Sequence, residues 1–252
     1  MRRTVQPIQG LWIGAELSIM EALSITSFLR HGHDYHLYVY EDVAHIPPGT
    51  VIKDGNEVIP AARIFQYRDF ATYAGFANFF RYKLLWDKGG WWADTDVVCL
   101  QPFDFQEAYV FSTEAVRGAA VITAGVIKAP AASAVMQYAW HTCQTKNPAQ
   151  LVWGEVGARL MAEAVKTFAL EHYAKPPEVF CPFGYGDWEK VLEAHLPWAL
   201  PATTYAVHLW NDMWRRHSCN KNQRFHPHCL YEQLKRKYLE PANEDRYRPG
   251  AP

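Results

Sequence analysis

The chain has 252 residues, of which 49% are hydrophobic and 20% are charged, and this composition excludes an intrinsically disordered protein. Lys and Arg number 25 against 26 Asp and Glu, so the formal net charge of −1 gives no electrostatic reason to expect a nucleic acid or an anionic membrane as partner. The length predicts a single domain over residues 1–239, followed by a frayed tail over residues 240–252.

The N-terminal segment and the cysteines together predict a cytoplasmic protein. The two arginines near the start are not followed by an apolar run, so this segment does not resemble a signal peptide. We expect no transmembrane segment, because no stretch reaches the roughly 18 apolar residues that a membrane span needs. The five cysteines are odd in number and widely spaced, which argues against a disulfide scaffold. Peripheral membrane contact stays open, since 15% of the residues are aromatic.

Apolar patterning through the first half of the chain predicts alternating strands and helices. In chain order we expect a strand over 8–13, a helix over 16–30, a strand over 36–40, a loop at 47–49, a helix over 74–87 ended by two glycines, and strands over 96–100, 109–112 and 121–128.

The second half of the chain predicts more helix than strand. We expect helices over 135–143 and 156–173, a break at the two prolines 176–177, short strands over 179–181 and 205–209, and a terminal helix over 229–238. The alternation of strands and helices predicts an α/β layered fold. In such sheets, ligands bind beyond the carboxyl ends of the strands.

Two aspartates near the middle of the chain are the most informative feature. A predicted helix that carries Arg81 ends at a Gly-Gly pair, two tryptophans follow, and Asp94 and Asp96 then precede an apolar strand. Their carboxylates can face one point, and hard oxygen ligands suit Mn²⁺ or Mg²⁺ with diphosphate oxygens completing the shell. An isolated Asp-x-Asp pair usually marks only a solvated turn, so the surrounding residues carry the inference.

Those surroundings resemble a known family. The segment from Arg81 to Val98 resembles the RYxxLxxxGGxYxDxD signature of GT-A glycosyltransferases with a DXD sugar-binding region, a group that includes yeast mannosyltransferases, bacterial capsule-synthesis transferases and, more distantly, the clostridial glucosylating toxins. Residues 11–14 resemble the opening strand of the same group, and residues 207–214 resemble its C-terminal region. The three matches occur in the expected order.

The resemblance implies a GT-A (Rossmann-like) mixed sheet flanked by helices, with a mainly helical C-terminal elaboration. It implies a metal-dependent, retaining enzyme that moves a hexose from a nucleotide-diphosphate sugar to a hydroxyl of a glycan acceptor, in bacterial surface polysaccharide synthesis. A UDP-sugar is the favoured donor and a GDP-sugar the alternative, with Mn²⁺ or Mg²⁺ as the cofactor.

The resemblance also implies roles for residues in the first half of the chain. Trp12 would stack on the nucleotide base with Ile13 beside it, and Arg81 would lie near the diphosphate or ribose. Asp94 and Thr95 would contact the donor, while Asp96 would bind the metal directly. Asn78 stands where many relatives carry Asp, and it can still hydrogen-bond a sugar hydroxyl.

Four residues in the second half receive roles by the same resemblance. His208 would be a third metal ligand, and Asn211 would bind the diphosphate. The Trp214 indole N–H would reach the β-phosphate, and Glu155 would line the donor or acceptor pocket. Each role has a structural alternative: a core position for Trp12 or Trp214, an ion pair for Arg81, a buried hydrogen bond for His208, and a helix-dipole contact for Glu155.

Other readings of the sequence stay open beside this one. A catalytically inactive sugar-nucleotide or glycan-binding module would share the fold, and a metal-dependent phosphohydrolase would share the metal. The latter usually needs more clustered carboxylates or histidines than the sequence places near residue 94. A group of histidines and cysteines near the C-terminus, His217, Cys219, His226, His228 and Cys229, matches no common zinc-finger spacing.

Overall fold

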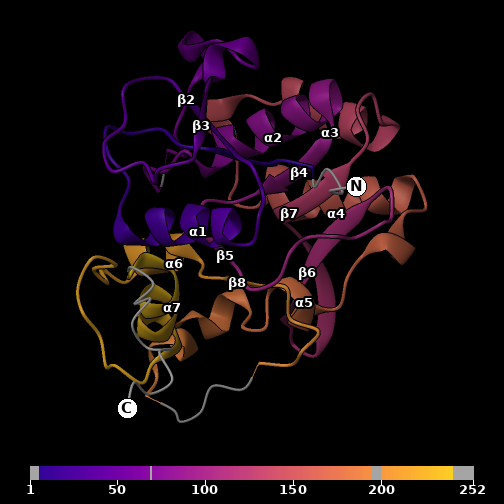
Figure 1. Cartoon of the computed structure of the whole chain (residues 1–252). Helices are drawn as coiled ribbons and strands as arrows, with labels where there is room; N and C mark the ends of the chain where they lie inside the picture. Colours follow the sequence, from indigo (N-terminus) through magenta and orange to yellow (C-terminus); the bar gives the residue numbers. More distant parts are fainter. Residues whose placement is uncertain (1–5, 69, 195–199, 241–252) are drawn as a thin grey trace, which may run out of the picture.

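A mixed six-stranded sheet lies at the centre of the protein (Figure 1). The computed structural model describes residues 6–68, 70–194 and 200–240. The strand order is β3-β2-β1-β4-β7-β6, and a second sheet pairs β5 with β8. The strands are β1 Ile8–Leu11, β2 Tyr35–Val39, β3 Val51–Asp54, β4 Gly90–Ala93, β5 Val97–Cys99, β6 Val110–Val116, β7 Ala119–Ala129 and β8 Ala206–His208.

The order of these strands creates a crevice in the middle of the sheet. Strands β1, β2, β3 and β4 are mutually parallel, with β2 on one side of β1 and β4 on the other. Strands β7 and β6 then continue the sheet in antiparallel fashion. The chain therefore reverses its direction of travel across the sheet between β1 and β4, and such a switch point is where α/β sheets bind ligands.

Helices cover both faces of the sheet. One face packs against α1 and α7, and the opposite face packs against α2, α3 and α4. The helices are α1 Ile19–Arg30, α2 Ala74–Lys88, α3 Ala134–Gln144, α4 Leu160–Thr167, α5 Pro177–Phe180, α6 Asn211–Arg216 and α7 Leu230–Leu239. Ser18 and Glu21 form a capping box that starts α1. No helix in the described ranges combines the length and the apolar character that crossing a bilayer requires.

The side chains of β4 alternate between the two cores, as those of a central strand must. Trp91 packs into the core beneath α1 and α7, and Trp92 packs into the core beneath α2. Both indoles are almost fully buried. Burial of aromatic side chains this large stabilises both faces of the strand, so the segment directly before Asp94 is held firmly in place.

The expected α/β class and mixed sheet are confirmed. Most predicted elements are present within a few residues of their expected bounds, including the helices that contain α1, α2, α3 and α7. Three elements were not predicted: β3, β4 and α6. The predicted helix over 156–173 is instead a π-turn, Glu155–Arg159, followed by the shorter α4. The predicted tail lies, from residue 241, outside the described residues.

The strand predicted over 179–181 is wrong. Residues Pro177–Phe180 form the short helix α5, with Pro177 at its first turn. Proline favours this position because its φ angle is already helical and its missing N–H has no helical partner to lose.

The Gly-Gly pair sets the course of the chain from α2 into β4. Gly89 has φ +64°, and its N–H donates to the carbonyl of Leu85. A Cβ atom at this position would lie 2.3 Å from the backbone nitrogen of Ala131, so the two chain segments meet at a distance that only glycine allows. The close approach places β4 against β7.

Gly89→Ala should therefore lower the free energy of unfolding by about 2–5 kcal/mol, from left-handed backbone strain of about 1–2 kcal/mol and a steric clash of about 1–3 kcal/mol. Gly118→Ala is the matched control, because Gly118 also has positive φ but has no atom within 4 Å of the added Cβ. Denaturant unfolding should show only the strain cost, about 1–2 kcal/mol, in that variant. Equal losses in the two variants would contradict the close approach.

Candidate active site

A cavity of about 530 Å³ opens at the switch point. Trp12 follows β1 into it, Asp94 follows β4, and Asn78 and Arg81 reach it from α2. Residues from the C-terminal half complete the wall, with His208 at the end of β8. The cavity thus collects side chains from the carboxyl ends of neighbouring strands, as expected for this sheet order.

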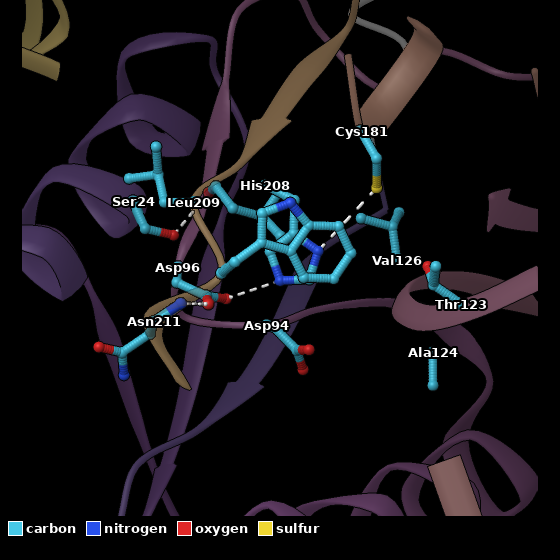
Figure 2. Close-up of polar contacts among 12 residues, drawn as sticks. Ser24, Asp94, Asp96, Thr123, Ala124, Val126, Cys181, His208, Leu209 and Asn211 are labelled. Atoms are coloured by element: carbon cyan, nitrogen blue, oxygen red, sulfur yellow. Dashed lines mark hydrogen bonds and ion pairs between the residues drawn. The ribbon is translucent and has the colours of Figure 1, made fainter. Parts of the chain in front are cut away.

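Three potential metal ligands lie together in the cavity, as Figure 2 shows. One ligand atom from each of Asp94, Asp96 and His208 lies within 4.8 Å of the other two. His208 Nε2 is 3.2 Å from Asp96 Oδ1, and the backbone N–H of Asn211 donates to Asp96 Oδ2 at 2.7 Å. No other group of three or more such side chains occurs in the part of the chain that the structure describes.

Asp94 is held by two donors from the opposite side. The indole N–H of Trp92 donates to Asp94 Oδ1 at 2.9 Å, and Arg81 Nη2 is also 2.9 Å from this oxygen. Arg81 donates in addition to the carbonyl of Ala124, and its guanidinium lies 4.9 Å from the centre of the Trp92 ring. These contacts leave Asp94 Oδ2 without a donor from Trp92 or Arg81, and it lies beside Gly125 in the cavity lining.

The surroundings shift the pKa values of the three clustered residues in different directions. Burial raises the pKa of the Asp94 carboxyl above its ordinary value; Arg81 opposes this rise and the Asp96 carboxylate adds to it. Burial also disfavours ionised Asp96, but the charge and hydrogen bond of His208 outweigh burial, so the pKa of Asp96 is lowered. The pKa of His208 is raised well above its ordinary value, because the Asp96 carboxylate outweighs the effect of burial.

Neighbouring residues fix the orientation of His208. The imidazole stacks on the Trp210 indole with ring centres 3.8 Å apart, and Nδ1 lies 4.0 Å from the Cys181 thiol (Figure 2). Gly125 permits this arrangement, since a Cβ there would lie 2.7 Å from His208 Cε1. Because Nδ1 faces the Cys181 thiol, Nε2 faces the two carboxylates. In metal-binding histidines, the group that contacts the nitrogen not bound to metal usually orients the ring.

The structure brings most of the predicted site residues into one cavity. Nine of them line it: Trp12, Ile13, Asn78, Arg81, Asp94, Thr95, Asp96, His208 and Asn211. The Trp12 indole N–H is buried without a hydrogen-bond partner among the described residues, although its ring packs partly against the core. A buried donor without a partner costs free energy, so this N–H is a local cost of the fold.

Two predicted residues lie elsewhere. Trp214 is fully buried, and its indole N–H already donates to the carbonyl of Leu209 at 2.7 Å, so it does not reach the cavity. Glu155 pairs with Lys146 at 2.8 Å and is absent from the cavity lining, which Trp153, Gly154 and Gly157 form instead. A π-turn with left-handed Gly154 at its start directs the glutamate away from the cavity.

Sequence reasoning missed several residues of the site. Glu114, Tyr185, Trp210 and Asp212 also line the cavity, and Cys181 contacts His208 from outside it. Only Trp210 had a detectable signal, as the neighbour of the C-terminal motif around His208. Glu114 lies within a strand, where an isolated glutamate carries no spacing signal.

Two family models match separate segments of the chain, and both segments contribute residues to the cavity. Residues 20–112 match the glycosyltransferase sugar-binding region containing DXD motif, and residues 149–238 match the alpha 1,4-glycosyltransferase conserved region. The first match includes Asp94 and Asp96, and the second includes His208. Two separate segments of the chain thus match glycosyltransferase family models, one of them the sugar-binding region that contains the DXD motif.

Individual relatives match the chain to different extents. Lactosylceramide 4-alpha-galactosyltransferase of Pongo pygmaeus is 34% identical over 74 residues, which are 24% of this chain and 34% of that protein. A solved structure described as PaToxG Glycosyltransferase has a TM-score of 0.47 at 14% identity, over 65% of this chain and 69% of its own. A transferase mutant also has a TM-score of 0.47, at 10% identity, over 77% and 93%.

Arg81→Met should destabilise the protein, because it leaves Asp94 beside Asp96 without its guanidinium partner. Breaking a buried ion pair costs about 3–5 kcal/mol, and the 26% exposure of the Asp94 side chain reduces the expected loss to about 2–3 kcal/mol. Lys83→Met on the same helix removes only a surface pair with Asp87 and should cost less than about 1 kcal/mol. Urea unfolding of both variants tests this, and similar losses would argue against a special role for Arg81.

Proposed function

We propose that the protein is a metal-dependent, retaining hexosyltransferase that moves a sugar from a nucleotide diphosphate to a hydroxyl of a glycan acceptor. The observation that carries this proposal is the convergence of Asp94, Asp96 and His208 in the cavity that Trp12 also lines. A metal site alone would fit a hydrolase as well. An aromatic side chain that lines the same cavity favours a nucleotide, whose base can stack on the ring.

The donor atoms of the cluster suit a divalent cation. Two carboxylates and one imidazole are ligands that Mn²⁺ accepts, and the imidazole favours Mn²⁺ over Mg²⁺. When bound, the cation neutralises charge on the departing diphosphate. Asp96 and His208 would hold it together with Asp94 Oδ2, the oxygen that Trp92 and Arg81 leave free.

The remaining residues would bind and orient the donor. Trp12 stacks on the base, with Ile13 beside it, while Asn78 and Thr95 offer hydrogen bonds to the sugar or ribose. Arg81 acts mainly as a positioning residue for Asp94, because its guanidinium is already paired with this carboxylate and with the Ala124 carbonyl. Asn211 orients Asp96 through its backbone N–H.

The transfer step needs no protein nucleophile. The C1–oxygen bond to the diphosphate breaks, and its electron pair stays on the diphosphate. The acceptor oxygen forms the new bond to C1 from the same face, and its proton passes to the departing diphosphate. Such a step depends on positioning and on electrostatic stabilisation, both of which a preorganised cavity supplies.

A UDP-sugar is the proposed donor, with a GDP-sugar as the alternative. UDP-galactose is the first donor to test, since one relative is a galactosyltransferase. The proposal includes a surface-polysaccharide acceptor, on the basis of the sequence resemblance. It also includes a cytoplasmic location, on the basis of five cysteines that form no disulfide. An inactive sugar-nucleotide-binding module is the alternative, and turnover separates the two.

UDP should raise the melting temperature only when Mn²⁺ is present, because the diphosphate needs the cation as a bridge to the carboxylates. At a hundred times its dissociation constant, UDP would stabilise the folded state by about 2.7 kcal/mol. Asp96→Asn should abolish this stabilisation and the transfer reaction. Asparagine can still accept the Asn211 N–H, which alanine cannot, so the substitution spares that structural contact.

Asp187→Asn is the matched control, since Asp187 forms an exposed pair with Lys190 outside the cavity. It should keep both the Mn²⁺-dependent melting shift and transfer. Stabilisation of the unaltered protein by UDP in excess chelator would contradict the metal bridge. Metal-dependent binding of UDP without any turnover of UDP-galactose, UDP-glucose or GDP-mannose would favour the inactive binding module.

A further inference from the structure

The cavity extends past His208 to a second polar wall, and the proposed function gives none of the residues in this wall a role in binding the donor. This wall consists of Glu114 on β6, Tyr185 after α5, and Asp212 on α6. The Trp210 indole separates it from the metal ligands, with His208 stacked on Trp210 and Tyr185 packed edge-on against Trp210, ring centres 5.6 Å apart. The wall is thus adjacent to the cluster but distinct from it.

Glu114 presents one carboxylate oxygen that the protein does not use. The backbone N–H of Tyr185 donates to Glu114 Oε2 at 2.7 Å. A Cβ on Gly184 would lie 2.9 Å from the Ala115 carbonyl, so this segment packs closely against β6 and fixes the carboxylate. Within the described ranges, Oε1 has no hydrogen-bond donor and no lysine or arginine pairs with this carboxylate, while the charge of His208 favours its ionised form.

The Tyr185 ring is equally well fixed. Its hydroxyl donates to Asp212 Oδ2 at 3.1 Å, and Asp212 pairs in turn with Arg215 at 2.6 Å and Arg216 at 2.5 Å. The guanidinium of Arg216 lies between the Phe70 and Trp153 rings, at 4.1 and 4.3 Å from their centres. The two arginines pair with Asp212, so Glu114 is the carboxylate of this wall that no arginine contacts.

A fixed aromatic ring beside a free carboxylate oxygen is suited to a sugar. An ionised carboxylate is purely a hydrogen-bond acceptor, so it binds hydroxyl groups, and the ring offers a flat apolar surface to the C–H groups of a pyranose. Burial raises the pKa of Glu114 above its ordinary value, which reflects a poorly hydrated carboxyl whose hydrogen bonds are strengthened. A carboxylate oxygen directed at the bound sugar disfavours a carboxylate group on that sugar.

We propose that Glu114 and Tyr185 form the acceptor subsite, that this subsite takes an uncharged hexose, and that Glu114 Oε1 accepts a hydrogen bond from the hydroxyl that attacks the donor. The inference rests on the proposed transfer function. It assigns Glu114 to binding and orienting the acceptor; the hydroxyl proton still passes to the departing diphosphate, as in the step above.

The test separates transfer from hydrolysis of the donor. The full chain is assayed with Mn²⁺ and with UDP-galactose, UDP-glucose or GDP-mannose as donor. Two rates are measured: hydrolysis of the donor by water, and transfer of its sugar to the methyl glycosides of galactose, glucose and glucuronic acid. Glu114→Gln keeps an oxygen for the Tyr185 N–H but loses the charge. Transfer to the neutral glycosides, as kcat/KM for the acceptor, should fall about 10- to 100-fold, while hydrolysis and the donor KM change less than about twofold.

Two controls keep the outcome interpretable. Glu107→Gln removes a carboxylate whose partner, Lys175, lies outside the cavity, and it should change neither rate. Glu114→Asp keeps the charge but shortens the side chain, and it should lower transfer without lowering hydrolysis. Saturation-transfer NMR with UDP and Mn²⁺ present provides a readout without turnover: methyl galactoside or methyl glucoside should bind the unaltered protein and not Glu114→Gln.

Three results would overturn the proposal. Equal losses of hydrolysis and transfer in Glu114→Gln would place Glu114 at the donor, and unchanged transfer would leave it a purely structural role. If the protein transfers sugar to the glucuronide as well as to the neutral glycosides, the assignment of an uncharged hexose as acceptor is wrong. If the unaltered protein neither hydrolyses nor transfers any of the three donors, yet binds methyl hexosides through Glu114, the proposed transfer fails while the sugar subsite stands.

Discussion

Asp94 and Asp96 place two carboxylates within 4.8 Å of each other in a largely buried site, and the repulsion between them has to be offset by neighbouring positive charge. Arg81 offsets Asp94, and His208 offsets Asp96, each through a contact of 2.9 to 3.2 Å. Arg81 also donates to the carbonyl of Ala124, whereas a neutral His208 imidazole offers a nitrogen ligand. Under the proposed function, Arg81 would therefore stay paired with Asp94 Oδ1, and Asp94 Oδ2, Asp96 and His208 would hold the cation.

The rest of the fold holds these four side chains in their relative positions. Strand β4 positions Asp94, helix α2 positions Arg81, and the small β5–β8 sheet sets Val97 opposite His208. The close backbone approach at Gly89 brings the start of β4 against the end of β7, and Gly125 on β7 lies directly beside the His208 ring. Glycine is needed at both places for different reasons: a left-handed backbone at Gly89, and room for the His208 ring at Gly125.

Sequence patterns predicted the chemistry of the site better than its architecture. The α/β class follows from local periodicity and the DXD motif from a contiguous signature, whereas the role expected for His208 came only from the resemblance of residues 207–214 to the family's C-terminal region. Strand β4 was missed, since Gly-Gly and Trp-Trp look like a turn, and only burial on both faces of a sheet explains them. The positions of Trp214, Glu155 and Glu114 depend on side-chain directions and on pairing across distant segments, which no local pattern encodes.

The most direct test of the account is whether His208 binds the same cation as Asp94 and Asp96. Electron paramagnetic resonance of Mn²⁺ with UDP, in protein labelled with ¹⁵N-histidine, measures this coordination through nitrogen hyperfine coupling. The account predicts one coupled histidine nitrogen, which His208→Gln removes while weakening Mn²⁺ binding about 10- to 100-fold. Tight Mn²⁺ binding without nitrogen coupling, unchanged in His208→Gln, would contradict it.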